Sequence, residues 1–73
     1  MVVHRSSYEI EQLLSGGASL EVSCKDYGSY EISGFIDGAK EGGGVLTIAD
    51  SDQLSSYELE SYAAEGRRHV AFR

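Results

Sequence analysis

Apolar side chains recur with the spacing of an amphipathic helix at three places in this chain. Each place opens with a tyrosine–glutamate pair, and apolar residues follow in the order i, i+3 and i+4. The three sets are Ile10, Leu13 and Leu14; Ile32, Phe35 and Ile36; and Leu59, Tyr62 and Ala63. This spacing puts each set on one side of a helix. We therefore predict helices that begin near residues 7, 29 and 56, and we prefer a helix to a strand over residues 30–38 because the pattern there matches the other two.

Residues just before the three segments are suited to starting helices. Ser6 with Glu9, and Ser55 with Glu58, have the spacing of a capping box, in which each partner's side chain accepts a hydrogen bond from the other's backbone N–H. Gly28 takes the capping position of the second helix, which is tolerated there. These signals agree with the apolar spacing and support the three predicted starts.

Glycines follow each predicted helix and are suited to ending it, because glycine accepts the left-handed backbone common after a helix. They are Gly16 and Gly17; Gly42, Gly43 and Gly44; and Gly66. The second helix is predicted to be about one turn longer than the others. Within it, Gly34 and Gly38 lie on one face, which predicts close packing against another backbone.

Apolar and polar residues alternate after each helix, as in a strand with one buried face. The apolar positions are Leu20, Val22 and Cys24; Leu46 and Ile48; and Val70 and Phe72. Right-handed crossovers between parallel strands in sequence order would place every helix on the same face of the sheet. We therefore predict an α/β fold of three helix–strand repeats, with the helices on one face of a small, mainly parallel three-stranded sheet. An antiparallel edge strand is the open alternative, and residues 2–3 are either a short edge strand or a frayed end.

The length of 73 residues predicts one domain, with repeat units at about 6–25, 28–50 and 55–73. A core this small would benefit from oligomerisation. The sequence has no apolar run long enough for a membrane span and no recognisable secretory signal. The single cysteine, Cys24, allows no internal disulfide, which suits a reducing compartment. We expect a cytoplasmic protein without membrane contact.

The net charge of −6 argues against direct binding of nucleic acid, which needs clustered lysine and arginine. It allows a basic partner. It also allows a second hypothesis, mimicry of nucleic acid, in which Glu9, Glu31 and Glu58 form a continuous acidic track with Glu11, Asp37 and Glu60. The plain interpretation is that the acidic surface keeps the domain soluble.

Few residues suggest catalysis. Cys24 and His69 both fall on predicted strands, but alternation points Cys24 to the apolar face and His69 to the open one. His4 and His69 have no companions at metal-ligand spacing. Gly42–Gly44 runs from a helix into a strand, the reverse of a phosphate-binding loop. We predict a non-enzymatic protein with no catalytic residues, metal or cofactor, and keep an enzyme subunit as the least favoured alternative.

Three groups of residues are candidates for binding. Tyr8, Tyr30 and Tyr57 occupy the same place in each unit, either covering junctions between units or forming an exposed edge. The open sheet face is predicted to carry Glu21, Ser23, Val45, Thr47, Ala49, His69, Ala71 and Arg73. Arg67 and Arg68, with His69 and Arg73, make a basic corner that either complements a helix end or contacts a partner, including another copy or one or two phosphates. The leading hypothesis is an acidic interaction domain (an adaptor, inhibitor or self-associating module) that binds a protein partner or forms a homodimer through the open sheet face and the tyrosine edge.

Overall fold

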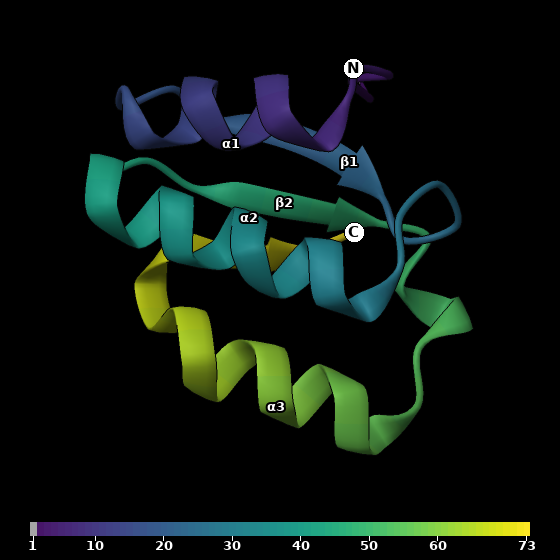
Figure 1. Cartoon of the computed structure of the whole chain (residues 1–73). Coiled ribbons are helices and arrows are strands. Elements are labelled where there is room, and N and C mark those ends of the chain that lie inside the picture. Colours follow the sequence, from purple (N-terminus) through teal and green to yellow (C-terminus); the bar gives the residue numbers. More distant parts are fainter. Residues whose placement is uncertain (1) are drawn as a thin grey trace.

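The computed structural model describes residues 2–73 and contains three helices, three strands and two short 3-10 turns (Figure 1). The elements follow in the order α1 (Ser7–Ser15), β1 (Leu20–Ser23), α2 (Ser29–Gly42), β2 (Leu46–Ala49), η1 (Ser51–Gln53), α3 (Ser56–Gly66), η2 (Arg67–His69) and β3 (Val70–Phe72). The predicted helix starts at 7, 29 and 56 are confirmed. The second helix is also the longest, with 14 residues against 9 and 11.

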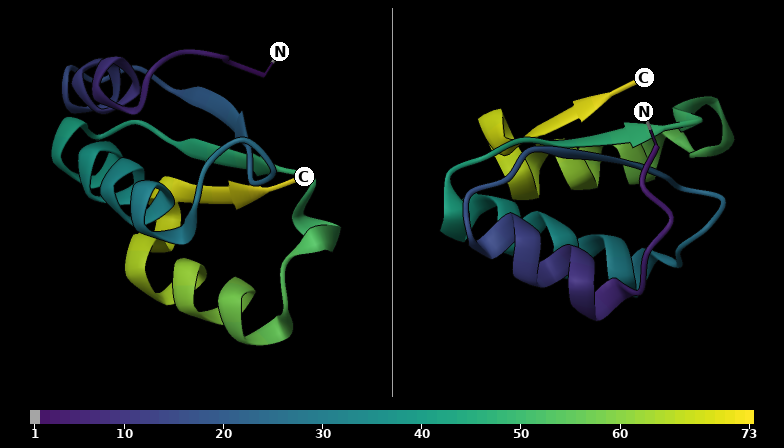
Figure 2. Two further views of the ribbon diagram at one scale, coloured as in Figure 1. Left: turned by 45° about the vertical axis from the view of Figure 1, so that its right-hand side comes forward. Right: turned by 90° about the horizontal axis from the view of Figure 1, so that it is seen from above.

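The three strands form one sheet in the order β1-β2-β3, and both pairs are parallel. Leu20 lies beside Leu46, and Leu46 lies beside Val70, so the three repeats pair in register. All three helices lie on one side of this sheet (Figure 2). The predicted two-layer α/β fold is therefore confirmed, and the antiparallel edge strand is excluded. Val2 makes a single parallel bridge to Glu21 at the outer edge of β1.

The core lies between the sheet and the helices. The sheet contributes Val22, Leu46 and Ile48, and the helices contribute Ile10, Leu14, Ile32, Phe35, Ile36, Ala39 and Tyr62. Two positions expected on the buried side differ: Ala63 is exposed, and Leu13 keeps 44% of its surface exposed. Within residues 2–73, the helices fall short of the length and apolarity that crossing a bilayer requires.

The helix starts use the predicted caps with one exception. In α3 the Ser55 and Glu58 side chains complete the capping box, and in α2 the Glu31 carboxylate accepts from the Gly28 N–H at 3.0 Å. In α1 the Ser6 hydroxyl accepts from the Glu9 N–H, but the Glu9 carboxylate turns to the Arg5 guanidinium, 3.3 Å away, and to the Ser6 hydroxyl. The box predicted there is therefore only half formed, because a cation competes for the carboxylate.

Glycines of α2 let that helix approach α1 closely. The predicted close approach is found at Gly38, where an added Cβ would lie 3.3 Å from Leu14 Cβ and 3.4 Å from the Glu11 carbonyl oxygen. At Gly34 an added Cβ would meet only the Glu11 carboxylate. The fit is tightest at Gly42, the last residue of α2, where an added Cβ would lie 1.9 Å from the Leu14 carbonyl oxygen.

The end of α3 differs from the prediction that Gly66 supplies a left-handed backbone. Gly66 has φ −93°, and the positive φ falls instead on Arg67, at φ 52° and ψ −125°. Glycine is needed at 66 for space, since an added Cβ would lie 2.9 Å from Val70 Cβ and 3.1 Å from Ile36 Cγ2. The end of α2 agrees with the prediction, because Gly43 adopts the left-handed backbone with φ 85°.

The sheet face opposite the helices is less open than its sequence pattern predicts. Ser23 and Ala49, both expected on that face in contact with solvent, are only 6% and 7% exposed. The Ser23 hydroxyl donates a hydrogen bond to the Asp50 carboxylate, which folds back from the end of β2. Arg73, beyond β3, reaches Glu21 on β1, so its side chain spans the middle strand. These contacts join side chains from different repeats, and strand alternation alone does not reveal them.

Candidate functional site

The N-terminal ends of the three parallel helices lie along one edge of the molecule, where each presents a tyrosine (Figure 1). Tyr8, Tyr30 and Tyr57 are 72%, 91% and 81% exposed. The interpretation that they cover junctions between repeats is therefore wrong, because a side chain that fills a junction loses most of its exposure. They are surface residues of equivalent position.

Two of these tyrosines share a hollow between α2 and α3. The exposed Tyr30 and Tyr57 line it together with Tyr62, which is only 4% exposed. The hollow measures about 440 Å³, and its remaining lining residues are Ser29, Ser33, Glu58 and Ser61. Burial raises the pKa of the Tyr62 hydroxyl, and the Glu58 carboxylate raises it further, so this phenol stays neutral. We call this the tyrosine hollow.

Tyr8 lies apart from the tyrosine hollow. It lines a separate depression on α1 with Arg5, Glu9, Gln12 and the partly exposed Leu13. The three tyrosines therefore do not line one common site. Tyr30 and Tyr57 line the tyrosine hollow, and Tyr8 lines the separate depression on α1.

The predicted acidic residues occupy the same position in each helix, and each of them forms contacts near the start of its own helix. They are Glu9, Glu31 and Glu58. One oxygen of Glu31 and one of Glu58 accept hydrogen bonds at 3.0 Å from the first N–H groups of their own helices. Glu9 pairs with Arg5 across 3.3 Å. Acidic side chains stabilise helix N-termini in this way, which accounts for their repetition without a ligand.

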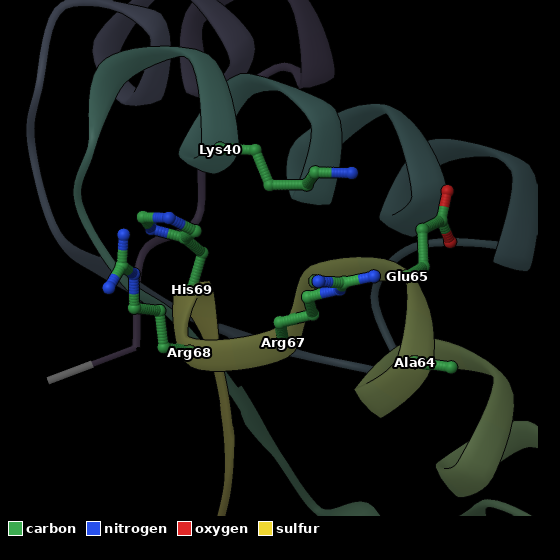
Figure 3. Close-up of a pocket in the computed structure, with 7 residues that line it drawn as sticks. Lys40, Ala64, Glu65, Arg67, Arg68 and His69 are labelled. Atoms are coloured by element: carbon green, nitrogen blue, oxygen red, sulfur yellow. The ribbon is translucent and has the colours of Figure 1, made fainter.

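The basic corner forms a second hollow, of about 740 Å³, between the C-terminal ends of α2 and α3 (Figure 3). Arg67, Arg68 and His69 of η2 line it together with Lys40 of α2. His69 therefore lies on a turn rather than a strand, and its Nδ1 is 2.8 Å from the Gly44 carbonyl oxygen. Arg73 does not join this hollow, since it lies on the opposite face of the sheet. We call the space around Lys40, Arg67, Arg68 and His69 the basic hollow.

Glu21, Thr47 and Arg73 come together on the open sheet face. One guanidinium nitrogen of Arg73 lies 2.9 and 3.1 Å from the two carboxylate oxygens of Glu21, whose side chain is only 13% exposed. A shallow depression of about 280 Å³ beside this pair includes Thr47 and Val45. The ion pair gives these residues a structural role, since it ties the first strand to the end of the third.

Cys24 sits just beyond β1, half-buried against the core, and its thiol lies 3.1 Å from the Asp50 carbonyl oxygen. Burial raises the pKa of the Cys24 thiol, and the charge of Asp50 raises it further. A reactive cysteine needs the opposite environment, one that stabilises the thiolate. His69 lies at a different corner of the molecule and therefore cannot act as a base for Cys24.

We expect Cys24 to react slowly with iodoacetamide. A raised pKa lowers the thiolate fraction at pH 8, so alkylation should be slower than that of an unstructured peptide cysteine. Asp50→Asn removes the charge but keeps a side chain that tolerates the positive φ of 59°. This variant should react faster than the wild type. A wild-type rate equal to that of the peptide would contradict the assigned environment.

Several residues that line these hollows were not among the sequence candidates, Tyr62 and Lys40 above all. Tyr62 was assigned only to the apolar side of its helix, and Lys40 was given no role. The i, i+4 spacing of Glu58 and Tyr62 indicates that they share a face of α3, but no local signal shows that α3 lies beside Tyr30. Likewise, Lys40 meets Arg67 only because the two helices are parallel neighbours.

Comparisons with known protein families, with curated proteins and with solved structures found no match to this chain. The fold defines the class, a two-layer α/β domain of three helix–strand repeats. Its function must be argued from the two hollows and their chemistry.

Proposed function

We propose that this domain is a non-enzymatic interaction module that binds a basic segment of a partner protein at the tyrosine hollow. The observation that carries the proposal is that the highly exposed Tyr30 and Tyr57 line one hollow together with the buried Tyr62. Tyrosine is enriched at protein interfaces because it offers a large rigid surface with a polar tip. Without a ligand, such exposed aromatic rings contribute little to the core.

The chemistry of the hollow favours an arginine or lysine side chain. The faces of tyrosine rings attract cations. Glu58 lines the same space, and its second carboxylate oxygen has no hydrogen bond to the helix start. The net charge of −6 would also draw a basic partner by long-range attraction. Ser29, Ser33 and Ser61 supply hydroxyls to the partner's backbone around the rings.

Mimicry of nucleic acid is less favoured by this geometry. It would use Glu9, Glu31 and Glu58 as substitutes for phosphates, whereas Glu9 pairs with Arg5 and one oxygen each of Glu31 and Glu58 is bonded to a helix start. These contacts reduce the negative charge that the three residues together offer to a partner. An enzymatic role has no comparable support, because the environment of Cys24 opposes a thiolate. Both remain hypotheses that the following experiment also addresses.

We expect a random peptide display library, selected on this domain, to yield sequences rich in arginine or lysine next to aliphatic residues. A selected peptide should bind the Tyr30→Ser, Tyr57→Ser double variant at least about tenfold more weakly, as expected when two central aromatic contacts are lost. Isothermal titration calorimetry would measure both affinities, at low and moderate salt.

Tyr8→Ser is the matched control, because Tyr8 has the same helix position and similar exposure but lies outside the hollow. It should change affinity by less than about twofold, the scale of peripheral contacts. Selection of acidic peptides, or equal binding by the double variant, would refute the proposal. Sedimentation of the unliganded protein adds a test for homodimers: a dimer lost only in the double variant would identify the partner as a second copy.

A further inference from the structure

We propose that the basic hollow is a binding site for a single phosphate monoester group. It lies at the opposite end of α2 and α3 from the tyrosine hollow and is lined by different residues. The inference is independent of the proposed protein-binding function. Three observations carry it: the gathering of unpaired cations, the backbone strain at Arg67 and the fixed position of His69.

Positive charge is concentrated here in an otherwise acidic molecule. Lys40, Arg67 and Arg68 are three of the chain's six lysines and arginines, and all three are exposed. Among residues 2–73 no carboxylate forms an ion pair with any of them, whereas Arg5 and Arg73 have acidic partners at 3.3 and 2.9 Å. With acidic residues outnumbering basic ones two to one, the clustering leaves a local excess of charge that an anionic ligand would neutralise.

The basic side chains approach the hollow from α2 and from η2, the turn that follows α3. Lys40 and Arg67 extend in the same direction from its two facing sides, and Arg68 and His69 stand at its other end (Figure 3). Glu65 lies at the rim near the tip of Arg67, and its carboxylate accepts a hydrogen bond from the Ser33 hydroxyl at 3.4 Å. Because Lys40 and Arg67 extend toward Glu65, the end of the hollow beside Arg68 and His69 is the one farthest from this acid (Figure 3).

Arg67 stands in a backbone conformation that glycine would adopt at lower cost. Its φ of 52° and ψ of −125° lie outside the regions favoured by residues with a Cβ. Strained residues of this kind concentrate at functional sites, where the side chain has a use that outweighs the strain. Here the strained backbone of Arg67 places its guanidinium in the lining of the basic hollow.

His69 has a fixed orientation beside the same space. A carbonyl oxygen only accepts hydrogen bonds, so Nδ1 must carry the proton that it shares with Gly44. The imidazole is thereby anchored to the loop that follows α2, and η2 is held against the end of that helix. The cations of η2 and Lys40 are thus positioned before any ligand arrives, which lowers the cost of binding.

The charge of the site selects among anions. Three cations and one carboxylate, Glu65, line the hollow and leave it a net charge of +2. This exceeds what one carboxylate or one phosphodiester can neutralise, whereas a phosphate monoester carries about −1.5 to −2 at pH 7. Arginine forks also match phosphate oxygens. An extended nucleic acid would meet strongly acidic surface beyond the hollow and be repelled. The helix N-termini, where anions commonly bind, are already filled by Glu31 and Glu58.

The test is an NMR titration that follows backbone amides, with inorganic phosphate, O-phosphoserine and an oligothymidylate as separate probes. We expect saturable shifts at Arg67, Arg68 and His69 with phosphate and phosphoserine, weakening as salt is raised. Arg68→Gln should reduce affinity about tenfold through loss of a charge-assisted contact. Lys25→Gln is the control, since this exposed lysine does not line the hollow, and it should leave affinity unchanged.

Arg67→Gly separates binding from folding. Glycine relieves the strain, so the melting temperature should rise by about 4 °C or more, while phosphate affinity falls about tenfold. Because the variant is more stable, lost binding cannot be attributed to unfolding. Unchanged affinity in Arg67→Gly, equal losses in Lys25→Gln, absence of saturable shifts, or tighter binding of oligothymidylate than of phosphoserine would each overturn the proposal.

Discussion

Replacing Gly42 with alanine is expected to destabilise the domain by at least about 3 kcal/mol, a large effect for one added methyl group. The new Cβ would lie 1.9 Å from the Leu14 carbonyl oxygen, 2.8 Å from the Gly17 nitrogen and 2.9 Å from the Ser15 oxygen. All three atoms belong to backbone, so no side-chain rotation can relieve the overlap. The end of α2 would have to move away from the end of α1.

A domain of this length has a total stability of roughly 4–11 kcal/mol, so Gly42→Ala would remove from about a quarter to most of it. Urea unfolding followed by circular dichroism would measure the loss. Gly34→Ala is the matched control in the same helix. Its Cβ would meet only the Glu11 carboxylate, at 3.0 Å, which can swing aside. Because alanine favours a helix by about 1 kcal/mol, this control should be neutral or slightly stabilising.

The comparison between the two glycines tests the packing of α1 on α2 directly. If Gly42→Ala unfolds at the same urea concentration as Gly34→Ala, the helix ends do not approach as closely as the structure shows. A reversed order, with Gly34→Ala the more damaging, would place the contact nearer the start of α2.

Replacing Phe35 with alanine is expected to cost about 3–5 kcal/mol. Phe35 is completely buried at the centre of the core. Its ring meets Tyr27 edge to face, with centroids 5.1 Å apart and planes at 81°. The Tyr27 hydroxyl in turn donates to the Arg5 carbonyl oxygen and accepts from the Arg5 N–H. Loss of the Phe35 ring would therefore leave a cavity and loosen the segment before α1.

Phe72→Ala is the matched control, because Phe72 lies on the edge strand β3 and is only half-buried. It should cost about 1–2 kcal/mol, in proportion to the smaller apolar area that it removes from water. Chemical denaturation of both variants gives the comparison. A larger loss for Phe72 than for Phe35 would show that the core is centred on the edge strand rather than under α2.

Much of the fold follows from short-range patterns. The spacing of Ile32, Phe35 and Ile36 and the box of Ser55 with Glu58 depend on residues within one or two turns, so they can be read without tertiary knowledge. Alternation in the strands then leaves one apolar face, and right-handed crossovers place the helices over it. The half-formed box of α1 shows the limit, since Arg5 captures the Glu9 carboxylate that the pattern assigned to the cap.

The candidate sites were less predictable than the fold. The sequence pointed to Tyr30, Tyr57, Arg67 and Arg68, but not to Tyr62 or Lys40 as their neighbours. Each hollow is built from two helices separated by a strand and a turn. Whether the lining residues come together depends on how α2 and α3 pack against each other. No spacing of residues along the chain encodes that packing. The same argument applies to Tyr8, equivalent by sequence yet outside the hollow.

The sequence by itself therefore determined where helices and strands form and which face of each is apolar, because those properties come from near neighbours along the chain. Only the tertiary structure decided that Ser23 and Ala49 are covered, that Arg67 rather than Gly66 bears the positive φ, and that three unpaired cations meet in one place. Each of these depends on contacts between segments more distant in the chain. Such contacts are set by how whole elements pack, and that packing optimises the core as a unit rather than residue by residue.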